Sequence, residues 1–170
     1  MLNKIASLLM LVTSFYSIAE VSEETKYASF TVQVNLAKYS EKSDLCHNKM
    51  RNFTLSDVNK GKIQKLPKEA GVGLSKLLVD ALLRCAQPEV FNLANSLLIL
   101  QEQNSVEKSA VIEEQVYLIR KLVFSKTTIA PNIEYSKLSP EMQSKLNSIE
   151  FLKHPFDMIE VIEGAWGVPH

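Results

Sequence analysis

Apolar residues recur at intervals of three and four through Pro67–Phe124, which carries most of the regular hydrophobic periodicity of the chain. This spacing places them on one face of a helix. The pattern predicts helices over Pro67–Ala86 and Glu89–Gln103. A third helix is expected to begin near Asn104 and to end by Phe124. Because the connections are short, the three helices should be antiparallel neighbours.

The second of these helices has an unusually wide apolar face. Phe91, Leu98 and Ile99 extend its apolar stripe over more than half of the helix circumference. A helix with this pattern is either buried on several sides or covers the surface of a partner.

Residues near the predicted helix ends refine these boundaries. Gly71 and Gly73 each weaken the first turns by about 1 kcal/mol relative to alanine, which favours a start nearer Leu74. Asn104 can cap the third helix, and Glu107 three residues later can return a carboxylate to the cap.

A different period appears before this stretch. Apolar and polar residues alternate strictly over Phe30–Leu36, which predicts a half-buried strand. The only candidate partners are the short segments Thr127–Ile129, Ile133–Tyr135 and Met158–Ile162. The strand therefore pairs with one of these, pairs with another chain, or forms an extended arm on the helices.

The remaining segments complete the predicted fold. Tyr39–Leu66 has the least regular pattern, and Ser125–Ser136 has the composition of an extended linker. Ser139–Glu141 starts a helix with a capping serine, a first-turn proline and an acid. His154–Pro155 interrupts it. We expect a mainly α protein, a small bundle of about five helices with one N-terminal β-strand or extended arm.

The irregular segment is basic. Between positions 42 and 65 it has two acidic residues and six basic ones: Lys42, Lys49, Arg51, Lys60, Lys62 and Lys65. The simplest interpretation is a solvated loop, and the alternative is a docking patch for an acidic partner or an anionic surface. The segment from 134 to 163 is mildly acidic instead.

A short last helix after Pro155 gives the candidate partner-binding residues. Its spacing places four residues on one apolar face: Phe156, Ile159, Ile162 and Trp166. Three acids step along another face: Asp157, Glu160 and Glu163. We take Phe156, Trp166 and the three acids as a possible partner-binding surface. The alternatives are burial of both aromatic rings against the preceding helices, and a catalytic carboxylate pair, which this spacing favours less than a solvated stripe.

The N-terminus has the pattern of a signal peptide over Met1–Ala19. A basic start is followed by an apolar run and by small residues at Ser17 and Ala19, with cleavage before Glu20. The run is shorter than the roughly 20 residues that span a bilayer, although a membrane anchor is the alternative. Glu20–His170 would then be a single mainly helical domain without a transmembrane segment, periplasmic or secreted.

The two cysteines of the chain, Cys46 and Cys85, are expected to form a disulfide, because an exported protein meets an oxidising environment. The alternative is two unpaired thiols. A metal site formed by Cys46, His47 and Cys85 fits the spacing of structural zinc sites poorly.

Composition and motifs narrow the function. The 19 basic and 19 acidic residues give no basic surplus of the kind that nucleic acids require. The sequence has no glycine-rich phosphate loop, zinc-protease motif or hydrolase serine elbow. It therefore suggests no catalytic, cofactor or metal residues.

The leading hypothesis is an exported non-enzymatic protein that binds another protein, such as a periplasmic inhibitor. In size, export, helicity and single disulfide the chain resembles the helical immunity proteins that neutralise periplasmic toxins. No motif matches residue by residue, so the resemblance supplies no site residues. The alternatives are a small exported hydrolase or effector that uses carboxylates, and a carrier of a small apolar ligand. The oligomeric state is left open.

Overall fold

The structure is a computed structural model that describes residues 21–124 and 129–167. The chain is mainly helical, as expected. The described residues form eight α-helices and two short 3-10 helices, so the expected count of about five was too low. In order they are α2 (Glu23–Arg51), α3 (Asp57–Gln64), η2 (Lys68–Gly73), α4 (Leu74–Cys85), α5 (Glu89–Glu107), α6 (Ala110–Val123), α7 (Ile129–Ser136), α8 (Pro140–Asn147), η4 (Glu150–Lys153) and α9 (Met158–Trp166). The predicted signal peptide lies outside the described residues.

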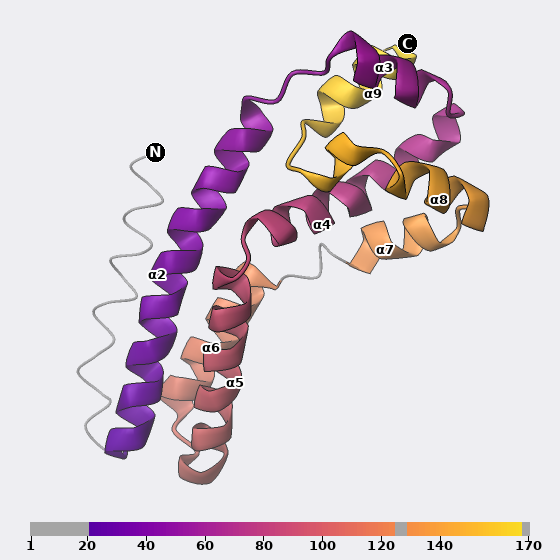
Figure 1. Cartoon of the computed structure of the whole chain (residues 1–170). Helices are drawn as coiled ribbons and strands as arrows, with labels where there is room; N and C mark the ends of the chain where they lie inside the picture. Colours follow the sequence, from indigo (N-terminus) through magenta and orange to yellow (C-terminus); the bar gives the residue numbers. More distant parts are fainter. Residues whose placement is uncertain (1–20, 125–128, 168–170) are drawn as a thin grey trace.

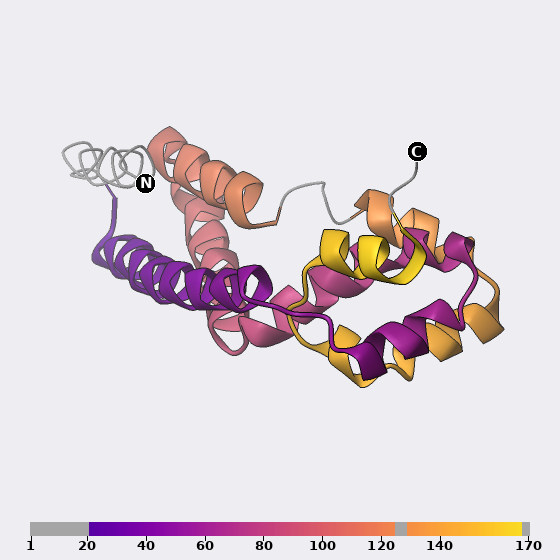
Figure 2. The same cartoon turned by 90° about the horizontal axis from the view of Figure 1, so that it is seen from above.

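The helices gather in two groups (Figure 1). We call the long group α2, α5 and α6 the arm, and the shorter elements α3, η2, α4, α7, α8, η4 and α9 the head. In the arm the chain ascends along α2, descends along α5 and returns along α6 (Figure 1). Figure 2, seen from above, shows the arm helices to one side of the head. The helix α4 leads from the head to the arm, so both groups depend on its position.

The arm has its own hydrophobic core. The side of α2 that faces it has residues at helical intervals of three and four: Thr25, Ala28, Val32, Leu36, Tyr39 and Cys46. The other two helices contribute buried aliphatic residues: Leu93, Leu97, Leu100, Ile112, Val116 and Ile119.

The predicted N-terminal strand is wrong, because Phe30–Leu36 lies in the middle of α2. The flanking sequence favours a helix: Ser22 caps it by accepting a hydrogen bond from the Thr25 amide, and glutamates occupy its first turn. In the helix Val32 is fully buried, whereas Phe30 points outward. The helix satisfies every backbone group locally, and the strand would have needed a partner.

Two segments expected to be irregular are also helical. Within Tyr39–Leu66, α2 continues to Arg51 and α3 follows. The predicted linker Ser125–Ser136 contains α7, whose Tyr135 is buried in the head core. Packing of their apolar residues against neighbouring elements stabilises these short helices. Their own sequences give little sign that they are helical.

Two predicted helix starts are confirmed. The regular helix begins at Leu74, and the glycine-containing turn before it is η2. Gly73 faces the head core so closely that an added Cβ would lie 2.9 Å from Leu138 Cδ1. Ser139 caps α8 as predicted, but α8 ends at Asn147, well before the expected break at His154–Pro155. The separate turn η4 then ends at Lys153.

The predicted start near Asn104 is wrong. The helix α5 continues through it to Glu107, and Lys108 then reverses the chain in a left-handed conformation with φ of 55°. The Asn104 amide closes this turn: its Oδ1 accepts from Ser109 N at 2.9 Å, and its Nδ2 donates to Ser109 O at 3.1 Å.

Glu107 caps a helix that is distant in sequence. Its carboxylate accepts hydrogen bonds from Ser22 N at 3.2 Å and from Thr25 Oγ1 at 2.8 Å, and also from the Ser22 hydroxyl. These donors, led by the Ser22 hydroxyl, lower the pKa of Glu107. The carboxylate thereby joins the end of α5 to the start of α2.

Candidate functional site

The two aromatic residues of the predicted partner-binding surface lie against the head. Phe156 is fully buried, and its ring centroid lies 6.4 Å from that of Phe53 and 6.2 Å from that of Phe151. Trp166 is partly buried, and its Nε1 donates to Leu66 O at 3.1 Å. Both rings therefore contribute to the stability of the head.

The single apolar face expected for the last helix does not exist. Ile159 is 63% exposed, while Val161 and Ala165 are the buried residues of α9. The helix begins at Met158, so Phe156 lies before it and does not share its periodicity.

The three acids of this segment have separate positions. Asp157 Oδ1 caps α9 by accepting from Ile159 N at 2.8 Å and from Glu160 N at 3.1 Å. The Glu160 carboxylate accepts from Leu55 N at 2.8 Å, which ties α9 to the loop before α3. Glu163 is exposed. They do not converge into one carboxylate pair.

Exposed large apolar residues lie on all three helices of the arm. On α5, Phe91 is 68% exposed and Leu98 is 65% exposed, and their seven-residue spacing puts them on one face. Ile99 and Val106 form a second row beside them with the same spacing. The wide apolar pattern of this helix in the sequence is thus only partly explained by burial within the chain.

The other two arm helices contribute similar residues. Exposed large apolar side chains on α2 and α6 are Tyr27, Phe30, Leu45, Tyr117, Leu118 and Leu122. Single exposed apolar residues are ordinary on protein surfaces, but contiguous groups of them mark interaction sites.

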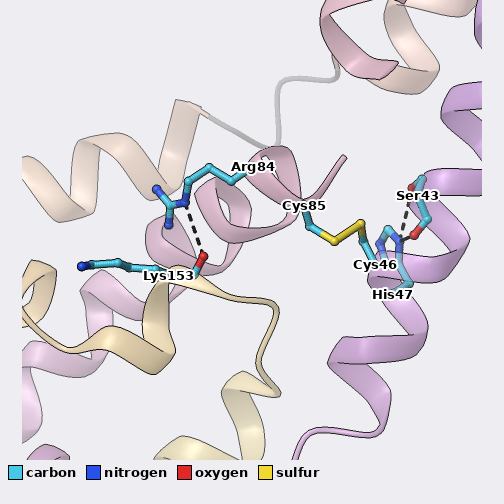
Figure 3. The surroundings of a disulfide bond; sticks show 6 residues. All are labelled: Ser43, Cys46, His47, Arg84, Cys85 and Lys153. Carbon is cyan, nitrogen blue, oxygen red and sulfur yellow. Dashed lines mark hydrogen bonds between the residues drawn. A yellow bond between two sulfur atoms is a disulfide. The ribbon is translucent and has the colours of Figure 1, made fainter. Parts of the chain in front are cut away.

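The predicted disulfide is confirmed and lies where the arm meets the head. Cys46 of α2 is joined to Cys85 at the end of α4, with a Cα–Cα distance of 5.9 Å (Figure 3). The Cys46 side chain packs against Ala86 and Val90. His47 beside it donates from Nδ1 to Ser43 O at 2.8 Å, one turn earlier in α2.

Next to the disulfide is an open cleft of about 880 Å³. Its walls come from α4, from the segment between α8 and Pro155, and from the end of α2. Basic residue types lie along it: Lys49, Arg84, Lys153 and His154. Arg84 Nε donates to Lys153 O at 3.4 Å (Figure 3), and Lys153 Nζ forms an ion pair with Glu150 at 2.6 Å.

Two carboxyl groups of the head have lowered pKa values because of lysines on their own helical turns. A hydrogen bond from Lys145, supported by its charge, lowers the pKa of Glu141. A hydrogen bond from Lys153 does the same for Glu150, with smaller contributions from its charge and from His154 and Lys62. Both acids are therefore held in the charged form.

Within residues 21–124 and 129–167, no group of three or more His, Cys, Asp or Glu side chains could hold a metal ion. In the same part of the chain, none of the helices combines the length and apolar character needed to cross a membrane.

Comparison with known proteins gives no relative: no family model matches the chain, and no curated protein or solved structure does so either.

Proposed function

We propose that this chain is an exported, non-enzymatic protein that acts by binding another protein through the outer faces of its arm. The observation that supports the proposal most strongly is the pair of apolar rows on α5, Phe91 with Leu98 and Ile99 with Val106. This helix already buries one complete stripe in the arm core.

Covering the exposed apolar residues of α5 with a partner is energetically favourable. Burying a large apolar side chain that is otherwise exposed contributes about 1.5–3 kcal/mol. Phe91 and Leu98 are each about two-thirds exposed, at 68% and 65%. Covering them with a partner would therefore contribute several kcal/mol before the cost of association, and leaving them in water gives the isolated chain nothing.

The disulfide supports the proposed compartment. A disulfide such as Cys46–Cys85 is typical of periplasmic or secreted proteins, because cytosolic thiols are kept reduced. The sequence pattern of Met1–Ala19 supports the same localisation. The proposed partner is thus a protein encountered after export.

The test is site-specific photo-crosslinking in the source cell. A photoreactive phenylalanine replaces Asn95, which is exposed on α5 between Phe91 and Leu98, and a control copy carries it at the exposed head residue Glu69. We expect one specific heterologous product from position 95 and none from position 69. Phe91→Ser combined with Leu98→Gln should abolish that product while the far-UV circular dichroism spectrum stays unchanged.

Three outcomes would contradict the proposal. They are no product from Asn95, the same product from both positions, or a product that consists only of two copies of this chain. In the last case the arm would be a homo-oligomer interface.

A further inference from the structure

We propose that the groove between α5 and α6 receives an acidic amphipathic helix of the partner protein. This inference rests on the proposed function, because it names the part of the partner that lies beside the exposed row of Phe91 and Leu98. Three observations support it: the shape of the groove, the exposed apolar side chains along it, and the charges of its lining.

The groove follows two antiparallel helices of the arm (Figure 1). It is open to solvent and has a volume of about 1300 Å³. Its α6 wall extends from Glu113 to Phe124, roughly 16 Å of helix at 1.5 Å per residue. The residues of its α5 wall recur at intervals of three and four: Gln101, Asn104, Ser105 and Lys108. An elongated groove between two helices suits a third helix, which is a common mode of recognition between proteins.

Exposed apolar side chains lie along the groove on both helices. Leu98 is 65% exposed and lies one turn before the lining residue Gln101, so it continues the same face of α5. Tyr117 is 59% exposed, Phe124 is 41% exposed, and both line the groove from α6. Their seven-residue spacing places these two rings on one face. A partner helix with its own apolar stripe can therefore contact side chains from both walls.

The charged residues that line the groove are mainly basic. Three basic residues and one acid belong to the lining: Lys108, Arg120, Lys121 and Glu113. Within residues 21–124 and 129–167, none of these four forms an ion pair. The exposed acids Glu102 and Glu114 lie on the same two helices but outside the lining. The charge of the groove therefore complements an acidic helix and disfavours a basic one.

Two of the cations lie beside the residues that would contact the partner helix. Lys121 Nζ is 5.9 Å from the centre of the Tyr117 ring, so one positive charge is held next to an exposed aromatic side chain. Arg120 Nη1 donates to Gln101 Oε1 at 3.4 Å, a contact that joins the two walls. Carboxylates on the flanks of a helix seated on Tyr117 would thus meet both cations.

The test compares two photo-crosslinking positions in the source cell. A photoreactive phenylalanine replaces Ser105, which is exposed in the groove, and a second copy of the protein carries it at Asn95. We expect both positions to give the same heterologous product. Mass spectrometry of the Ser105 product should place the link in a segment with a helical apolar stripe flanked by Asp or Glu residues. A synthetic peptide of that segment is then the probe for affinity measurements by fluorescence anisotropy.

The double charge reversal Arg120→Glu/Lys121→Glu should raise the dissociation constant of the peptide about tenfold or more, because attraction becomes repulsion. The matched control is Lys65→Glu/Lys68→Glu, the same charge change at two exposed residues of the head. It should leave the dissociation constant unchanged. Far-UV circular dichroism should show that both variants keep the helical content of the parent protein.

The outcomes separate this inference from the proposed function. A product from Asn95 without one from Ser105 leaves the proposed function standing and overturns the groove as the docking site. A linked segment without acidic residues also overturns the inference, as does a peptide that binds Arg120→Glu/Lys121→Glu as tightly as the parent. The absence of a product from both positions contradicts the proposed function and this inference together.

Discussion

Removing the disulfide should destabilise the protein, because it breaks the covalent link between α2 and α4. The perturbation is the double substitution Cys46→Ala/Cys85→Ala. Alanine is preferable to serine because Cys46 is only 1% exposed, and a buried hydroxyl without a partner would add an unrelated penalty.

The magnitude follows from the length of chain that the bond closes. The two cysteines are 39 residues apart in sequence. On the chain-entropy model a loop of this length stabilises the folded state by about 4 kcal/mol. The loop contains the end of α2, which belongs to the arm, and α3, η2 and α4, which belong to the head, so in the unfolded chain the bond constrains segments of both.

The assay is urea unfolding followed by circular dichroism at 222 nm. With an m value of about 2 kcal/mol/M, the midpoint should fall by about 2 M urea. Each single substitution also removes the bond, so Cys46→Ala and Cys85→Ala alone should destabilise nearly as much as the pair. A loss below about 1 kcal/mol, or single effects that add up to the double effect, would refute this reasoning.

Three further changes test particular contacts. Glu107 has a lowered pKa in the folded protein, so its contribution to stability is present above the unfolded pKa and is lost as the pH falls through the folded pKa. The melting temperature of Glu107→Gln should therefore fall less between neutral and acidic pH than that of the parent protein. Phe156→Ala should lower the free energy of unfolding in urea by about 3–5 kcal/mol, because the ring is fully buried. Ile159→Ala on the same segment should change it by no more than about 0.5 kcal/mol. Equal effects of the two substitutions would contradict the described packing. Gly73→Ala should destabilise the protein by about 1–3 kcal/mol through overpacking. At Gly61 an added Cβ meets nothing within 4 Å, so Gly61→Ala should stabilise α3 by up to about 1 kcal/mol. Differential scanning fluorimetry should show a lower melting temperature for Gly73→Ala and a higher one for Gly61→Ala.

The candidate site shows where sequence reasoning succeeded and failed. The wide apolar pattern of Phe91, Leu98 and Ile99 already indicated a helix that is buried on several sides or covers a partner, and the structure leaves these residues exposed. The aromatic residues Phe156 and Trp166 gave no such signal, because a short spacing pattern does not distinguish a buried ring from an exposed one.

The cleft beside the disulfide could not be predicted at all. Lys49 and Arg84 are 35 positions apart, and each has the appearance of an ordinary charged residue in the sequence. They line one cleft because α2 and α4 meet at the cystine. The basic character of the segment around Lys49 is visible in the sequence. The sequence does not show that Arg84 lines the same cleft.

The sequence alone determined the helical character of the chain, the disulfide pairing, and the cap at Ser139. These depend on local chemistry, such as a side chain beside its own backbone or two cysteines without other partners. Tertiary structure decided that Phe30–Leu36 is helical, that Glu107 caps α2, and which apolar faces stay in water. Those outcomes depend on which surfaces meet, and a periodic pattern records that a face is apolar without recording what covers it.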